Sequence, residues 1–399
     1  CVPRYRNVMN EKGISPGDMR SATDLVALPV LTRQFVQQHR EELVADGFPR
    51  ERLRVTRTSG STGIPLEFYS TGEDQRDHGF ARSIRALQWT GIQLGDRTAT
   101  VGRPRSYGAG PSYVLRSIAR WMQRSIPVYV DSLSDENLPY VVRLLASARL
   151  VGIRAYPNAI ALIAAFIKDT GAPVPEVKTI VTGGAELLSH ERSIVRDVFG
   201  TEPHSNYSSY EAYEIACECS AHEGLHISAE DVLVEVVDDS DTPVPPGVEG
   251  RILITNLHNY GMPFIRYDIG DSGTILAGAC PCGRTLPRLG SLVGRKNRFL
   301  VTRSGSRIFS GTLFLDRLSS LGMRQYQIIQ DSVGTVVMRL AADPSASSAD
   351  ERSALEQKVL DMFQAKFGPE LALSVEFVDR IEPTEAGKHV FMLSRVPQD

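Results

Sequence analysis

The segment Arg57–Pro65 has a composition suited to holding an anion. It reads RTSGSTGIP, so glycines at Gly60 and Gly63 alternate with hydroxyl residues directly after the strand-like run LRVT. Such a loop can direct backbone N–H groups and hydroxyls at phosphate oxygens. No Gly-Lys-Ser/Thr follows, so it is not a Walker-type loop. A Ser/Gly-rich surface turn is the alternative interpretation of this segment taken alone.

Four of the five cysteines lie in two Cys-x-Cys pairs that suggest a metal site. The favoured ligands are Cys219, His226, Cys280 and Cys282. Three thiolates and one imidazole are a natural tetrahedral set for Zn²⁺, although the spacing is unlike that of a zinc finger. Cys217 and His222 compete as ligands, and cysteines without a metal remain the simpler alternative. A closed set of four ligands leaves no position for substrate, so we expect a structural role.

Composition limits the classes of partner. The 399 residues carry a formal net charge of -3, with 42% hydrophobic and 23% charged residues, which is typical of a globular enzyme and not of a nucleic-acid-binding protein. The longest apolar run, Ala159–Ile167, is far shorter than the roughly 20 residues that cross a bilayer. We therefore predict a cytoplasmic protein with neither nucleic acid nor membrane as partner. Because the sequence begins at Cys1 inside a helix-like pattern, we expect an upstream segment to be missing.

The elements that must position these residues alternate between strand and helix from Arg97 onward. Short apolar strands are expected near Ala99–Val101, Pro127–Val130, Leu150–Tyr156 and Val177–Val181. Helices are expected near Ser112–Gln123, Asp135–Ser147, Asn158–Lys168 and Leu187–Phe199. Such alternation requires crossover connections, so it predicts a mainly parallel sheet covered by helices.

The pattern changes near Ile227 and again near Arg298. Closely spaced strands broken by Pro/Gly turns follow Ile227 and predict a small antiparallel subdomain. Beyond Arg298 come strands near Gln325–Ile329 and Val336–Leu340, a long helix Ala349–Phe367 and the strand LSVEFVD. The predicted fold is thus α/β: a large mixed α/β domain, residues 1–296, with a parallel sheet and a β-rich subdomain, and a small α+β domain, residues 297–399.

Further segments in the same order as the phosphate loop carry a family resemblance. They are VTGGAELL, NYSSYE, FIRYDIGD, the pair GR and finally EAGK. Together with RTSGSTGIP they resemble the adenylate-forming ligases, in particular the phenylacetate-coenzyme A ligase-like and CapK-like branch, and the match runs nearly end to end. The spacing of the cysteines also resembles a metal site of this branch.

The resemblance implies how ATP is held. The residues that would contact the nucleotide are Thr58, Ser59, Gly60, Ser61, Thr62, Gly63, Gly184, Ala185, Glu186, Asn206, Tyr207, Asp271 and Arg295. The loop would take the β- and γ-phosphates, the segment at Gly184 with Tyr207 would flank the adenine, and Asp271 would bind the ribose hydroxyls. Arg295 would support the ribose-phosphate region.

The resemblance also implies two catalytic residues. Joining a carboxylate to the α-phosphate of ATP brings two anions together, so catalysis depends on positioning and on cations. Glu211 would help to hold Mg²⁺, and Lys388, carried by the small mobile domain, would bridge the α-phosphate and the carboxylate oxygen. Taken alone, Asp271 could be a turn residue and Lys388 a solvated loop lysine.

Three departures from the family pattern affect these expectations. Tyr210 stands where the family usually has a small hydroxyl residue, which alters the pocket. Asn297 and Arg298 replace an acidic pair at the domain hinge, so the hinge is expected to move differently. The amino-terminal helices that line the acid pocket or a dimer contact are expected to be missing, and a homodimer stays open.

The sequence predicts activation of a small carboxylic acid, with an aromatic acid as one option. The pocket candidates are Tyr107, Tyr156, Pro157 and Phe264, although such residues are more often part of a core. Coenzyme A, a carrier-protein thiol, an amine or no acceptor at all fit the same motifs. An AMP-transferring enzyme that acts on a cofactor and a non-catalytic nucleotide-binding protein are the alternative functions.

Overall fold

The computed structural model describes residues 2–58, 66–72, 78–102, 124–129, 133, 137–184, 187, 189–293, 299–309, 323–342, 349–379, 381 and 392–396. By its contacts the chain divides into two compact units. The first comprises Cys1–Thr56 and Phe68–Arg295, and the second comprises Arg57–Glu67 and Lys296–Asp399.

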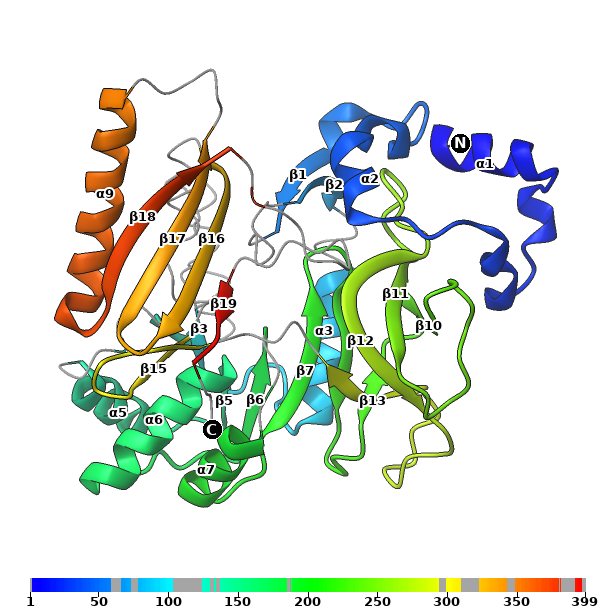
Figure 1. The fold of residues 1–399 in the computed structure, drawn as a ribbon. Helices are drawn as coiled ribbons and strands as arrows, with labels where there is room; N and C mark the ends of the chain where they lie inside the picture. The colour runs from blue at the N-terminus through cyan, green and yellow to red at the C-terminus, as the bar shows by residue number, and fades with distance from the viewer. Residues whose placement is uncertain are drawn as a thin grey trace. The chain divides into compact units, whose positions relative to one another are not determined.

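Among the described strands of the first unit, eleven form one sheet (Figure 1). Their order is β10-β11-β12-β13-β9-β8-β7-β6-β5-β3-β4. The bounds are β3 Thr98–Gly102, β4 Ser125–Tyr129, β5 Gly152–Ala155, β6 Thr179–Gly183, β7 His204–Ser209, β8 Tyr213–Glu218, β9 Leu225–Ile227, β10 Val232–Val237, β11 Gly250–Asn256, β12 Tyr267–Leu276 and β13 Arg288–Val293. Strands β3 to β7 pair in parallel, and every pairing from β7–β8 to β10–β11 is antiparallel.

The predicted α/β class is therefore confirmed, with one difference. The antiparallel strands after Ile227 do not form a separate sheet, because β8 pairs with β7 and extends the parallel sheet. Periodicity identifies a strand but not its partner, which explains why the sequence did not predict this continuity. The helix expected at Ser112–Gln123 lies outside the described residues.

Helices α5 Leu138–Ser147, α6 Pro157–Thr170 and α7 Ser189–Phe199 pack against the parallel strands. Proline at the first position of α6 needs no hydrogen-bond partner for its nitrogen, and Gly171 ends the helix with φ +66°. Ile160 and Ile163 on this helix are fully buried against Ile153 and Ile180 of the sheet. Truncating either helix residue to alanine should destabilise the fold by about 2–5 kcal/mol.

Residues before β3 form short elements at the antiparallel end of this sheet. They are α1 Pro3–Lys12, the 3₁₀ turns Pro16–Asp18, Ala22–Ala27, Arg40–Leu43 and Arg50–Arg52, α2 Arg33–Gln38, β1 Leu53–Arg57, β2 Glu67–Thr71 and α3 Gly79–Trp89. Leu31 exchanges backbone hydrogen bonds with Arg266 and Asp268 beside β12. Arg266 has a backbone φ of +50°, and its side chain is buried. The side chain donates a hydrogen bond to Leu28 O at 2.8 Å, which holds the amino-terminal segment against the sheet.

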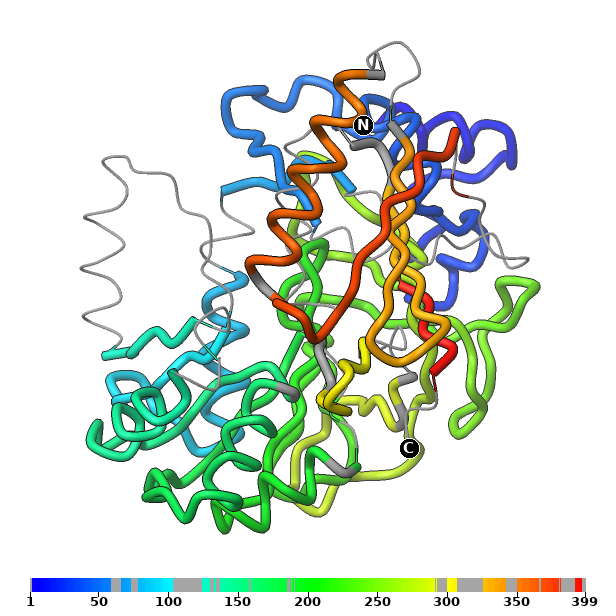
Figure 2. The backbone as a smooth tube through the Cα atoms, turned by 60° about the vertical axis from the view of Figure 1, so that its left-hand side comes forward, coloured from blue at the N-terminus to red at the C-terminus, as the bar shows by residue number. Residues whose placement is uncertain are grey.

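The second unit contains a described four-stranded sheet covered by one long helix. The elements are β14 Phe299–Val301, β15 Arg307–Phe309, β16 Met323–Ser332, β17 Thr335–Ala342, α9 Ala349–Phe367, the 3₁₀ turn Gly368–Glu370, β18 Ala372–Val378 and β19 Met392–Ser394. The sheet order is β18-β17-β16-β19, and α9 lies along β18 in both ribbon and tube views (Figure 2). Val359 and Phe363 of α9 pack with Met338 and Leu340 of β17 in the hydrophobic core of this unit.

Candidate active site and metal centre

The carboxyl ends of the parallel strands place Tyr156 between two glycines. Tyr156 follows β5, Gly102 ends β3, and Gly184 follows β6. A Cβ atom on Gly184 would lie 2.6 Å from Cε1 of Tyr156, and Gly184 has a φ of +80°. Only glycine lets the ring and the backbone approach so closely. Gly184, the first residue of the predicted adenine segment, lies at the edge where ligands bind in open α/β sheets. Ala185 and Glu186 lie outside the described residues.

Tyr207 and Asp271 meet although four positions in the sheet order separate their strands. The Tyr207 hydroxyl donates to Asp271 Oδ2 at 2.8 Å, from β7 to β12. In a flat sheet, four steps of about 4.8 Å would hold these strands roughly 19 Å apart. The antiparallel half must therefore curl back toward β7, and the strong curvature of β12 is visible in Figure 1. This curl brings together two residues that the sequence assigned to the nucleotide.

Glu211 lies in a buried setting beside the same strands. Its side chain is 6% exposed, and Tyr267 Oη lies 3.4 Å from its Oε1. Asn256 Nδ2 donates to the Glu211 carbonyl at 3.0 Å, which fixes the backbone at this residue. Tyr210, the departure noted in the sequence, is half exposed. A carboxylate held this way has few ways to reorient, as a metal ligand requires.

Asn206 makes a contact that its predicted ATP-binding role does not explain. Its side chain hydrogen-bonds the Glu214 carboxyl group, which is 5% exposed. Burial raises the pKa of Glu214, against the lowering effect of Arg154 and of hydrogen bonds from Asn206 and Ser83. The sequence analysis did not single out Glu214, because a lone glutamate in a strand carries no spacing signal.

The described ends of the phosphate loop close on each other within the second unit. Thr58 N donates to Leu66 O at 3.0 Å, and Leu66 N donates to Thr58 Oγ1 at 2.9 Å. An ion pair between Arg57 and Glu67 adds to this closure. These contacts hold the two described ends of the segment, Thr58 and Leu66, next to each other. Ser59, Gly60, Ser61, Thr62 and Gly63 lie outside the described residues, as do Arg295 and Lys388.

Cys219, His226, Cys280 and Cys282 come together as the sequence predicted. Their ligand atoms all lie within 4.8 Å of one another. The Sγ atoms of Cys219 and Cys280 are 3.7 Å apart, and Cys282 Sγ lies 3.3 Å from His226 Nε2. A tetrahedral ion with Zn–S bonds of about 2.3 Å and a Zn–N bond of about 2.0–2.1 Å requires separations of roughly 3.8 and 3.5 Å. The described set therefore fits Zn²⁺ closely.

The four residues of this set come from two parts of the sheet. Cys219 directly follows β8 and His226 lies on β9, while both remaining cysteines occupy the turn between β12 and β13. Gly224 has a φ of +84°, and a Cβ there would lie 2.6 Å from Leu289 O of β13. Burial raises the pKa of Cys219 to about 11. At Cys282 burial also raises the pKa, but hydrogen bonds with Arg284, and then with Cys280 and Cys219, outweigh it and lower the value to about 6.

The two competing ligands lie elsewhere. Cys217 is buried with its Sγ 3.8 Å from Ala86 O, and burial raises its pKa well above the usual value. His222 bonds Glu218 Oε2 at 3.2 Å and stacks obliquely on His204. Burial and then His222 lower the pKa of His204 to about 4. Neither competing side chain belongs to the tetrahedral set.

Of the predicted acid-pocket residues, Phe264 belongs to the core. It is 2% exposed and its ring centroid lies 5.3 Å from that of Phe68 and 4.8 Å from that of Tyr267. This is the alternative that the sequence analysis left open. Tyr107 lies outside the described residues, and Tyr156 remains beside Gly184.

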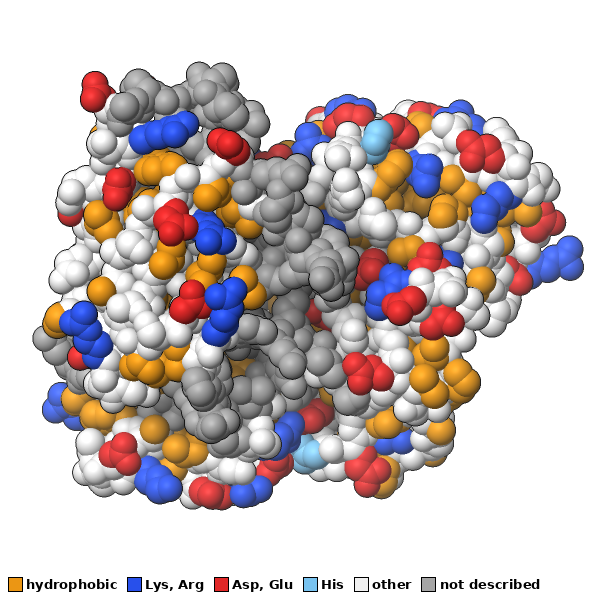
Figure 3. All heavy atoms as spheres, viewed as in Figure 1, with side chains coloured by type: hydrophobic (Ala, Val, Ile, Leu, Met, Phe, Trp, Pro, Cys, Tyr) orange, Lys and Arg blue, Asp and Glu red, His pale blue; other side chains and the backbone are white. Residues whose placement is uncertain are grey.

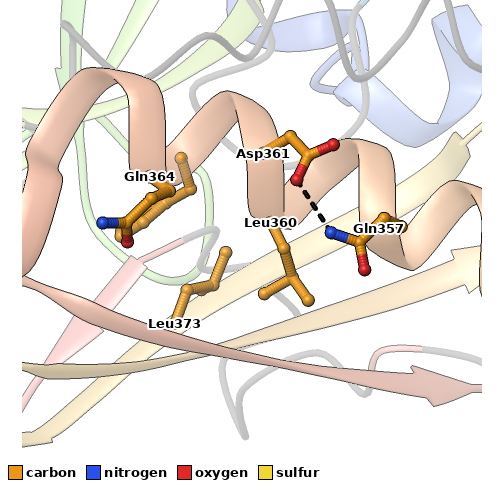
Figure 4. Close-up of a pocket in the computed structure, with 6 residues that line it drawn as sticks. Gln357, Leu360, Asp361, Gln364 and Leu373 are labelled. Atoms are coloured by element: carbon orange, nitrogen blue, oxygen red, sulfur yellow. Dashed lines mark hydrogen bonds between the residues drawn. The ribbon is translucent and has the colours of Figure 1, made fainter.

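A hollow on the second unit offers no catalytic chemistry. It measures about 220 Å³, and α9 and β18 line it with Gln357, Leu360, Asp361, Phe363, Gln364 and Leu373 (Figure 4). Among its polar groups, Gln357 Nε2 donates to Asp361 Oδ1 at 2.8 Å. The volume is below the 300–1,000 Å³ that is usual for ligand pockets.

Charged side chains of both signs are present on the described surface. On the face shown in Figure 3, Lys and Arg side chains are interspersed with Asp and Glu and do not form a basic stripe. Within the part of the chain that the structure describes, no helix has both the length and the apolar character to span a bilayer.

Comparison with known proteins relates the chain to ligases. Residues 300–395 match the family model described as the CapK C-terminal domain. The chain is 27% identical over 313 residues to a phenylacetate-coenzyme A ligase of Thermus thermophilus. This alignment covers 76% of the present chain and 68% of the Thermus protein. It is 20% identical over 403 residues to Protein CapK of Staphylococcus aureus, covering 98% and 85% of the two chains.

The solved structure of a 2-hydroxyisobutyryl-CoA ligase in complex with 2-HIB-AMP and CoA has the same fold. It aligns with a TM-score of 0.66 and 20% identity, covering 99% of this chain and 86% of that one. The chain thus has the fold of this ligase and resembles adenylate-forming ligases in sequence. Within this superfamily, the relatives that the chain resembles in sequence are phenylacetate-coenzyme A ligases and Protein CapK.

Proposed function

We propose that the protein uses ATP to activate a small carboxylic acid as its acyl-adenylate and then transfers the acyl group to a thiol. The observation that carries the proposal is the pairing of Tyr207 with Asp271 at 2.8 Å, in a chain of this fold that resembles these relatives in sequence. The curl of the sheet brings Asp271 beside β7, the strand that leads to Glu211, and the proposal assigns its carboxylate to the ribose hydroxyls.

In this proposal the first unit binds the nucleoside and the acid. Asp271 accepts hydrogen bonds from the ribose hydroxyls, and Tyr207 orients its carboxylate and offers a ring face to the adenine. Gly184 lets the Tyr156 ring lie against the backbone at the start of the adenine segment, and this ring then limits the size of the acid. Glu211 helps to hold Mg²⁺, which when bound neutralises charge on the phosphates.

The phosphate loop and Lys388 act on the reacting groups. Residues Thr58 to Gly63 hold the β- and γ-phosphates through N–H groups and hydroxyls, and Arg295 supports the ribose-phosphate region. The Lys388 ammonium group bridges the attacking carboxylate and the α-phosphate, so that two anions can approach. The proposal makes residues 297–399 the mobile domain that brings Lys388 to the site.

We also propose that Cys219, His226, Cys280 and Cys282 hold one structural Zn²⁺. The fit of the described distances supports this ion, and all four positions around it are occupied by protein ligands. By joining the end of β8 and strand β9 to the β12–β13 turn, the ion would stabilise the curl that carries Asp271. Catalysis would therefore depend on it only through the fold.

Coenzyme A is the proposed acceptor, because named relatives of the chain are coenzyme A ligases. The test is a panel of small aliphatic and aromatic acids, scored by pyrophosphate release with and without coenzyme A, with products identified by mass. An acyl-CoA product supports the full proposal. Transfer of AMP to a cofactor or formation of an amide would replace its second half, and ATP binding without pyrophosphate release for any acid would contradict it.

A further inference from the structure

Strands β7 and β8 carry a bulge at the residue that the proposed function assigns to the adenine. Tyr207 pairs with Ala216, whereas the next residue, Ser208, pairs with Glu214. Ile215 is therefore an extra residue on β8. A bulge breaks the ladder locally and changes the direction of the side chains beside it. Regular backbone pairing thus constrains the Tyr207 side chain less than it would in an unbroken ladder.

The Glu214 residue spans this bulge. Its backbone pairs with Ser208, the residue after Tyr207, and its carboxyl group accepts a hydrogen bond from the side chain of Asn206, the residue before Tyr207. Glu214 is 5% exposed, so water competes little for these contacts. Tyr207 therefore lies between two residues that the same glutamate holds.

Helix α3 and strand β5 fix Glu214 from other directions. Ser83 Oγ of α3 donates to Glu214 Oε2 at 3.2 Å. The neighbouring Arg82 side chain is buried and donates from Nη1 to Ala212 O at 3.1 Å, which holds the start of the same segment. Burial raises the pKa of Glu214, against the lowering effect of Arg154 on β5. A buried polar group with partners on several elements is costly to move, so it can serve as a fixed support for Asn206.

We propose that Glu214 is a positioning residue for nucleotide binding, which acts through Asn206 and the bulge to direct the Tyr207 hydroxyl at Asp271. The contact that it preserves is the 2.8 Å hydrogen bond from Tyr207 to Asp271 Oδ2. Glu214 itself would not touch ATP. The inference rests on the proposed function, because that function assigns Tyr207 and Asp271 to the nucleotide.

Two substitutions separate the reach of the Glu214 side chain from its charge. E214D keeps a carboxylate but shortens the side chain by one methylene, so it cannot hold Ser83 and Asn206 together. E214Q keeps the length and an oxygen that can accept from Asn206. The assay is direct titration of the full chain with ATP and Mg²⁺, which requires no knowledge of the acid. We expect ATP binding to weaken about fivefold in E214D and less than about twofold in E214Q, as for residues coupled by direct contact.

A double-mutant cycle connects the effect to Tyr207. In a Y207F background no hydroxyl group remains to be directed, so E214D should change ATP affinity by less than about twofold there. A purely structural role would weaken binding equally in both backgrounds. The matched control is E235D, which shortens another buried strand glutamate, one that accepts from Arg266 Nε at 3.1 Å. E235D should lower the melting temperature and leave ATP affinity unchanged.

S83A provides a second test if E214D does not fold, since it removes the α3 contact and leaves Glu214 intact. It should weaken ATP binding at least about twofold. The inference is overturned if ATP affinity is unchanged in E214D, or in S83A where E214D is unfolded. An equal loss in E214Q, in E235D or in the Y207F background also overturns it. A wild type that binds ATP but releases no pyrophosphate with any acid contradicts the proposed function and leaves the Glu214 test in force. A wild type that does not bind ATP overturns both.

Discussion

Replacing Tyr207 by phenylalanine removes one hydroxyl group and keeps the ring that would face the adenine. This hydroxyl donates to Asp271 Oδ2 at 2.8 Å, and both side chains are half-buried. A hydrogen bond to a charged group contributes about 1.5–3 kcal/mol, which corresponds to roughly 10- to 150-fold in affinity. Because water reaches the pair, we expect the lower limit, about a tenfold rise in the KM for ATP.

The assay is steady-state pyrophosphate release at varied ATP concentration, and Tyr5→Phe is the matched control. Tyr5 Oη donates to Pro263 O at 2.9 Å and accepts from Ile265 N at 3.0 Å. Y5F should therefore lower the melting temperature and leave the KM for ATP unchanged. If Y207F keeps the KM for ATP within about twofold, or if Y5F raises it equally, the assignment of the Tyr207–Asp271 pair to the nucleotide is refuted.

Four further predictions concern other parts of the proposal. Lys388→Ala should leave ATP affinity nearly intact and slow pyrophosphate release by roughly two decades. A wild-type rate of pyrophosphate release in this variant would contradict a catalytic role for Lys388. Cys280→Ser should lose zinc by elemental analysis and melt at lower temperature, and retention of both would contradict the structural centre. Gly184→Ala should weaken ATP binding at least about tenfold, because its Cβ would meet Tyr156, so unchanged ATP affinity in a direct titration speaks against this site. Arg298→Pro should impair adenylation and acyl transfer unequally, and equal effects on the separately measured half-reactions argue against a pivot there.

The fold could be predicted where the sequence has local signals. Pro157 and Gly171 mark the two ends of α6, and the long helix Ala349–Phe367 has the predicted bounds. The joining of the antiparallel strands to the parallel sheet could not be predicted, because pairing depends on which edge β8 meets. Pattern and propensity describe the residues of a strand and contain no information about that edge.

The candidate site, like the fold, could be predicted from residue types but not where strand pairing decides. The residue types in the cysteine segments sufficed to predict a tetrahedral set, but His222 and His226 lie within one turn of each other and spacing alone could not separate them. The strand register decides, because His226 pairs with Arg288 on β13 and thereby lies next to the β12–β13 turn.

The most direct test of the central claim is acid-dependent exchange of labelled pyrophosphate into ATP by the full chain. Adenylate formation is reversible and releases pyrophosphate, so an accepted acid must allow label to enter ATP before any acceptor is added. The account predicts exchange that requires the acid and Mg²⁺ and that falls by about two decades in K388A. Exchange that is independent of every acid in a broad panel, or ATP turnover that releases only phosphate, would contradict it.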